Sequence, residues 1–188
     1  MRGSIAIVAT ILALAFDSSF GSVLTLRSVG SLTPQAMPIL VVFIALFAPE
    51  SLALVVAIIL GIMVDLSIGH ELAGGAHLIG PHALGFLITT LLILKMRNIV
   101  FRRRVLTVTV FAASAIIVIG SVHAMVLLLR GMLPWNPAVL GGGFGEFIKL
   151  VGTAIYTGLF AVPLGWCLLS TIGMWKFHSP TGRRATWR

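Results

Sequence analysis

The sequence has few charged residues and very few acids. Only 10% of its 188 residues are charged and five of them are Asp or Glu, whereas 59% are hydrophobic and the mean hydropathy is +1.11. Soluble domains carry about 25% charged residues, so this composition excludes an ordinary soluble domain and indicates an integral membrane protein. The single cysteine, Cys167, lies in an apolar run, which excludes a disulfide framework and a thiolate metal site.

Six apolar segments are separated by short polar or glycine-rich stretches, and we expect each to form a helix. They are residues 4–20, 36–48, 52–68, 83–94, 105–129 and 147–174. Several are shorter than the ~20 residues that a span usually needs. We predict an all-α, polytopic integral membrane protein, a bundle of six short transmembrane helices that form one domain over residues 1–188; five spans are the alternative. Residues 1–15 also resemble a cleaved signal peptide, but the apolar run continues to Phe20, which favours a helix that stays attached.

The basic residues decide the orientation. Five lie between the fourth and fifth segments, four follow the sixth, and Arg2 precedes the first. Six spans with N- and C-termini in the cytoplasm place these ten inside, against Arg27, Arg130 and Lys149 outside. This positive-inside bias explains the net charge of +8 better than nucleic-acid binding does. The cytoplasmic basic loop contains a run of three arginines, Arg102, Arg103 and Arg104, which we interpret as a topology anchor. The alternative is that this run attracts anionic membrane lipid or an acidic cytoplasmic partner.

A stripe of small residues with one acid runs along the third segment. Residues four apart lie on one face of a helix, which aligns Ala53, Ala57, Gly61, Asp65 and Gly69. Small residues let another helix approach closely, and an acid in an apolar helix usually faces protein or water. We therefore predict that this stripe faces other protein and not lipid.

The first segment repeats this spacing with Ala9, Ala13, Asp17 and Gly21. At about 1.5 Å per residue, both acids fall near the outer boundary of a ~30 Å hydrocarbon core. Two interpretations remain open. Either the acids reach outer water, or one of them forms an ion pair with Arg130 at the outer end of the fifth segment.

A metal site or an active site is not expected. Residues 69–85 contain His70, Glu71, His77 and His82, but the helical zinc motif needs a second His where this sequence has Gly74. We interpret these histidines as structural or solvated and expect no metal and no cofactor. The sequence contains no G-x-S-x-G motif and no glycine-rich nucleotide fingerprint, so we do not predict an enzyme.

Two stretches resemble a known family. They are residues 61–69, Gly-Ile-Met-Val-Asp-Leu-Ser-Ile-Gly, and residues 78–85, Leu-Ile-Gly-Pro-His-Ala-Leu-Gly. The pattern is similar to that of the bacterial rod shape-determining protein MreD family, over about residues 34–130 and with residues 70–77 as an apparent insertion. On this resemblance Gly80 and His82 join the two stripes as candidates for helix packing or partner contact.

The resemblance implies a non-enzymatic scaffold of the bacterial cell elongation (rod) machinery in the inner membrane, which supports cell shape and peptidoglycan synthesis. Its partner would be the bitopic MreC and, through it, the MreB filament, with the elongation glycosyltransferase and transpeptidase nearby.

The alternative is a substrate-binding S component of an energy-coupling factor transporter. Those subunits also have six short spans, so the two folds are expected to be similar. Asp17, Asp65, His82 and Trp135 would then supply the polar groups of an outward-facing pocket. Co-purified MreC would support the scaffold, whereas an ATPase pair and a bound vitamin would support the transporter.

Overall fold

The computed structural model describes residues 3–20, 23–26, 31–68, 80–99, 104–131 and 143–175. Each of the six apolar segments is helical. The elements in chain order are α1 (Gly3–Ala15), the π-helical turn η1 (Phe16–Phe20), α3 (Ala36–Phe47), α4 (Glu50–Ile68), α5 (Pro81–Met96), α6 (Val105–Gly131), α7 (Gly143–Ser170) and α8 (Ile172–Trp175). Shortly before α3, Leu26 and Leu32 form an isolated antiparallel bridge.

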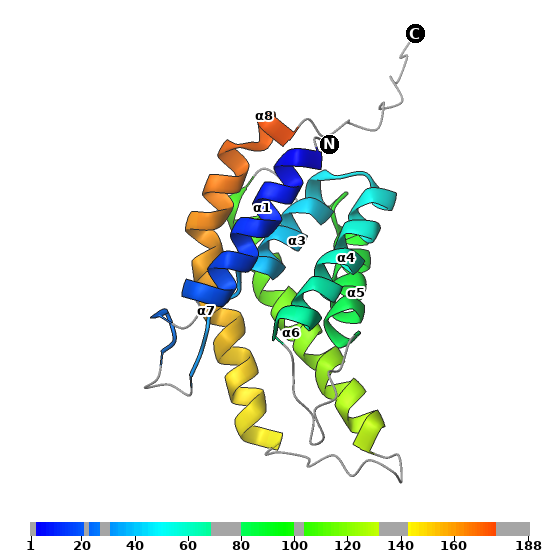
Figure 1. Cartoon of the computed structure of the whole chain (residues 1–188), viewed down its shortest axis with the longest axis vertical. Helices are drawn as coiled ribbons and strands as arrows, with labels where there is room; N and C mark the ends of the chain where they lie inside the picture. The colour runs from blue at the N-terminus through cyan, green and yellow to red at the C-terminus, as the bar shows by residue number, and fades with distance from the viewer. Residues whose placement is uncertain are drawn as a thin grey trace.

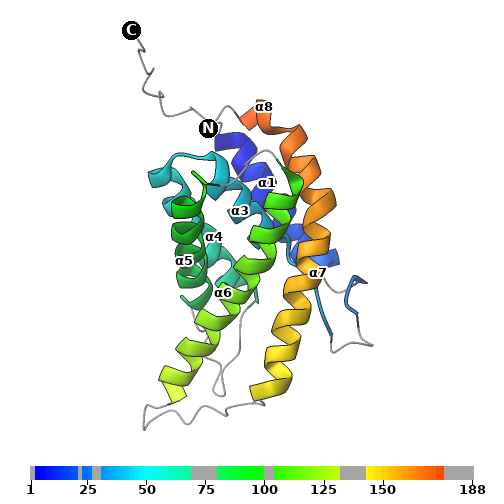
Figure 2. The ribbon, with the colours of Figure 1, turned by 180° about the vertical axis from the view of Figure 1, so that it is seen from behind.

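The helices alternate in direction along the bundle (Figures 1 and 2). α4 packs against α5, and α6 packs against α7 as an antiparallel pair. The first turns of α1 and the short α8 lie at the same end of the bundle and contact each other. At the opposite end, α6 and α7 continue past the ends of α1, α4 and α5.

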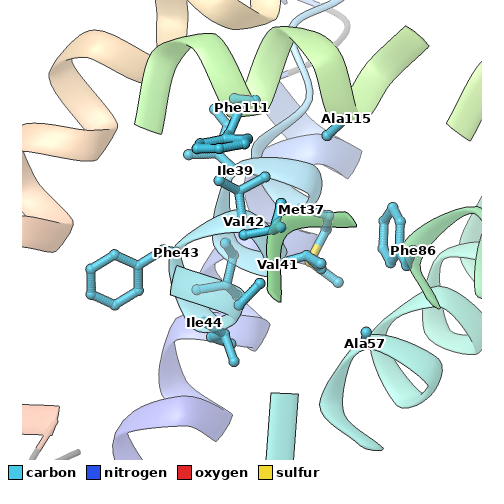
Figure 3. Close-up of a cluster of buried hydrophobic side chains, with 14 of the residues drawn as sticks. Met37, Ile39, Val41, Val42, Phe43, Ile44, Ala57, Phe86, Phe111 and Ala115 are labelled. Carbon is cyan, nitrogen blue, oxygen red and sulfur yellow. The ribbon is translucent and has the colours of Figure 1, made fainter. Parts of the chain in front are cut away.

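α3 forms the centre of the core. Every residue from Ala36 to Leu46 is buried, and side chains of α4, α5 and α6 surround the helix (Figure 3), among them Ala57, Phe86, Phe111 and Ala115. A helix that is hydrophobic all round is typical of such a central position. Pro38 is compatible with the helix because it lies in the first turn, where its missing N–H has no helical partner to lose.

The outer surface of the bundle is apolar. Three helices in the described ranges are long and apolar enough to cross a membrane: Glu50–Ser67, Val105–Leu129 and Phe147–Ser170. Ser4–Ser19, Ala36–Phe47 and Pro81–Met96 are apolar but shorter. Large side chains such as Leu12, Val55 and Leu159 are more than half exposed on the outer faces. Exposed apolar surface of this extent is typical of a helical bundle that lies in lipid.

Candidate functional site

Asp65, near the end of α4, binds the first turn of α5. Its Oδ2 accepts hydrogen bonds from the backbone N–H groups of Gly80 at 2.8 Å and Ala83 at 3.4 Å. Its Oδ1 accepts one from the N–H of His82 at 3.2 Å and lies 2.7 Å from the Nδ1 of the same residue. The Asp65 side chain is 2% exposed. The carboxylate is therefore fully engaged by the start of the next helix.

The start of α5 has no side-chain cap of its own. Gly80 occupies the N-cap position with φ 129°, a backbone conformation that favours glycine, and Pro81 follows. A helix leaves its first N–H groups without helical partners, and a carboxylate there also interacts favourably with the positive end of the helix dipole. Asp65 supplies from α4 what a local capping residue would otherwise provide.

Asp17 caps α3 in the same way. Its Oδ1 accepts a hydrogen bond from the N–H of Ala36 at 2.6 Å, and its Oδ2 accepts one from Met37 at 3.0 Å. The N-cap residue of α3 is Gln35, whose side chain makes no capping bond. The backbone N–H of Gln35 donates instead to the Oγ1 of Thr157 on α7, at 3.3 Å. The first turn of the central helix is thus held by η1 and α7 together.

The two aspartates perform one task in two successive helix pairs. Each lies near the end of one helix and caps the next, at sequence separations of 19 residues from Asp17 to Ala36 and 17 from Asp65 to His82. The first N–H groups of a helix have no helical partners, and neither helix start has a side-chain cap of its own, so an acceptor from the preceding helix satisfies them. This requirement explains why an apolar sequence keeps an acid at each of these positions.

The small-residue stripe of α4 packs inside the chain. Ala53 and Ala57 are each 1% exposed, and Gly61 is buried. A Cβ atom on Gly61 would lie 2.3 Å from the Cα of Ala83, so the backbones of α4 and α5 touch at this point. Glycine permits that approach. This face of α4 is therefore occupied by the chain's own α5.

The stripe of the first helix is buried less completely. Ala13 is 9% exposed and belongs to the core, whereas Ala9 is partly buried and packs against it. The interpretation that Asp65 reaches outer water is wrong, because its side chain is buried and bonded to α5. His82, beside it, lies 5.3 Å from His123 of α6, measured between ring centroids.

Several candidates lie outside the residues that the structure describes. They are Gly21, Gly69, His70, Glu71, His77, Arg102, Arg103 and Trp135, together with the side chain of Arg130. The ion pair of an aspartate with Arg130 therefore stays a prediction. Arg104 is described and exposed.

Arg97 is a structural contact that sequence reasoning missed. Its Nη1 donates to the carbonyl oxygen of Ala48, which follows the last residue of α3, at 2.8 Å, and its Nη2 donates to the Oε1 of Glu50 at 3.0 Å. The side chain of Arg97 is only 11% exposed, whereas that of Glu50 is 69% exposed. A cation at the negative end of the α3 dipole is favourable. The positive-inside rule already accounted for this arginine, so nothing in the sequence required a contact.

The family model of the rod shape-determining protein MreD matches residues 1–165. The chain belongs to the MreD family. Its membership assigns the chain to the determination of rod shape and extends the resemblance from residues 34–130 to the first helix and most of α7. Neither the comparison with curated proteins nor that with solved structures found a match.

Proposed function

We propose that this member of the MreD family is a non-enzymatic scaffold subunit of the bacterial cell elongation complex and supports peptidoglycan synthesis by binding MreC. The observation that carries the proposal is the family match, which includes both capped helix pairs. The non-enzymatic role is supported by the two acids near the helix ends. Asp17 and Asp65 direct their carboxylate oxygens to backbone N–H groups of α3 and α5.

The proposed placement is the cytoplasmic (inner) membrane, with six passes and both termini in the cytoplasm. The alternation of the helices supports it, as does the proximity of α8 to the start of α1. The basic residues that precede α6 and follow α8 agree with this orientation. Reporter fusions test it. An alkaline phosphatase fused within residues 132–142 should be active, and one fused within residues 100–103 should be inactive. The opposite pattern would contradict the orientation.

The proposed partner is the single transmembrane span of MreC, which would connect the chain to MreB, the glycosyltransferase and the transpeptidase. The buried stripe of α4 is already covered by α5, so we place the contact with MreC on an outer face of the bundle. Helix packing, not partner contact, is then the proposed role of Ala57, Gly61, Asp65, Gly80 and His82.

Affinity purification in mild detergent tests the function. The tagged chain, produced from its own chromosome position, should retain MreC at a constant ratio through purification. Asp65→Leu should lower the amount of folded chain and of MreC together, whereas Ser67→Ala, at an exposed position of the same turn, should change neither. Recovery of an ATPase pair and a bound vitamin in place of MreC would contradict the scaffold and support a transporter subunit.

A further inference from the structure

The basic residues of the chain are concentrated at one end of the bundle. Ten of the thirteen precede α1, follow α8 or lie between residues 95 and 104, and none of these three stretches contains an acid. The end of α5 and the start of α6 lie at the same end of the bundle as α8 (Figure 2). Glu50, in the first turn of α4, binds Arg97 at 3.0 Å. This end therefore carries a large excess of positive charge.

Two exposed bases lie where α5 ends and α6 begins. Lys95 is in the last turn of α5, Arg104 immediately precedes α6, and both side chains are exposed. Arg97 differs from them, because it is only 11% exposed and donates to the carbonyl oxygen of Ala48. Arg97 holds the helices together, whereas Lys95 and Arg104 present their charges at the surface.

Exposed apolar side chains lie close to these two bases along the same helices. They are Leu91, Leu92 and Met96 on α5 and Leu106 and Val110 on α6, each more than 40% exposed. An anionic phospholipid has the two matching parts, because its headgroup carries negative charge and its acyl chains are apolar. An acidic soluble protein would match the bases but would leave the apolar side chains uncovered. The combination therefore favours a lipid.

We propose that the α5–α6 lipid surface, which consists of Lys95, Arg104 and these five apolar side chains, binds anionic phospholipids in preference to zwitterionic ones. Bases that lie beside a membrane surface attract anionic headgroups. A topology anchor only orients the chain, whereas this surface would enrich one class of lipid around the folded protein. The inference rests on the proposed membrane placement and is independent of binding to MreC.

The test compares the lipid composition at the two ends of α6. One variant carries Leu106→Trp, and its matched control carries Leu128→Trp, an exposed leucine about six turns further along the same helix. In both, every native tryptophan except the buried Trp175 is replaced by Phe. The whole chain is reconstituted in equal parts of dioleoyl phosphatidylcholine and dioleoyl phosphatidylglycerol, and either one or the other lipid is dibrominated. The ratio of the two quenching signals measures the enrichment of phosphatidylglycerol at each site.

We expect the ratio at the Leu106 site to exceed that at the Leu128 site about fivefold, which corresponds to the ~1 kcal/mol that one base near the membrane surface contributes. The excess should decrease in 1 M salt, where the screening length is ~3 Å. Equal ratios at both sites, or an excess that salt leaves unchanged, would overturn the lipid surface and leave the membrane placement intact. Absence of quenching at both sites would overturn the membrane placement and, with it, this inference.

Charge variants test whether the two bases cause the enrichment. Lys95→Gln combined with Arg104→Gln, in the Leu106→Trp background, should lower the ratio toward that of the Leu128 site. Lys95→Arg combined with Arg104→Lys keeps both charges and should retain the ratio. Lys149→Gln removes an exposed base near the start of α7, at the other end of the bundle, and should also retain it. An unchanged ratio in the double Gln variant, or an equal loss in Lys149→Gln, would contradict the inference.

Discussion

Asp17 and Arg97 bind opposite ends of the same helix. The carboxylate of Asp17 accepts the N–H groups of Ala36 and Met37 at the start of α3, and the guanidinium of Arg97 donates to the carbonyl oxygen of Ala48 at its end. The negative group lies at the positive end of the helix dipole and the positive group at its negative end. Charged side chains from other elements therefore bind both ends of a helix of twelve buried or nearly buried apolar residues.

Replacement of Asp65 should destabilise the α4–α5 pair. Asp65→Leu leaves the N–H groups of Gly80 and His82 without their acceptor in a buried site, which costs about 1–3 kcal/mol. Asp65→Asn keeps one acceptor oxygen and should cost less. The free energy of unfolding is measured by titration of the detergent-solubilised chain with SDS. Equal stability of Asp65→Leu and Ser67→Ala would contradict the capping role.

Gly61→Ala should destabilise the chain even though alanine is the better helix former. The added Cβ meets the Cα of Ala83 at 2.3 Å, so the two helices must separate, at a cost of about 1–3 kcal/mol. Gly145→Ala is the matched control, because a Cβ there meets nothing within 4 Å and helix propensity favours alanine by up to about 1 kcal/mol. The same SDS titration compares them. A Gly61→Ala variant as stable as Gly145→Ala would show that the helices do not touch here.

Substitution of Arg97 should lower the free energy of unfolding more than substitution of its acidic partner Glu50. Arg97→Met removes the buried donor to the carbonyl of Ala48, and the loss should be about 1–3 kcal/mol. Glu50→Gln disrupts only the exposed half of the cluster, for which about 0–1 kcal/mol is expected. The difference between the variants, measured at low and high salt, separates the two contacts. A larger loss for Glu50→Gln would contradict this assignment.

The positions of the helices could be predicted because each is a long apolar run bounded by polar residues. α3 begins at Ala36 as expected, and the structural start of α5 lies two residues before the predicted one, at Pro81. The all-round apolar sequence of α3 also indicates its central place, since such a helix cannot expose a polar face.

The partners of the acids could not be predicted from spacing. Local capping signals are absent at Gln35 and Gly80, and the acceptors come from residues 15 or more positions earlier in the chain. The pattern of α4 places Asp65 on the same face as Ala57 and Gly61, whereas Asp17 lies in the π-helical turn that follows α1. The helix against which each face packs is decided by the tertiary arrangement of four helices, which a pattern within one helix does not contain. One sequence signal could have indicated these capping contacts: a helix start with no local capping residue, preceded by a helix with an acid near its end.

Double substitutions should distinguish two residues in direct contact from two residues that bind opposite ends of one helix. Asp17 and Arg97 act on ends of α3 that are about 18 Å apart at ~1.5 Å per residue. The losses of Asp17→Ala and Arg97→Met should therefore add to within about 0.5 kcal/mol. Asp65 and His82 are in direct contact, at 2.7 Å, so the losses of Asp65→Asn and His82→Ala should deviate from additivity by about 0.5–3 kcal/mol. Additive losses at Asp65 and His82 would mean that the α5 cap does not depend on the imidazole. Coupled losses at Asp17 and Arg97 would mean that α3 transmits strain along its axis.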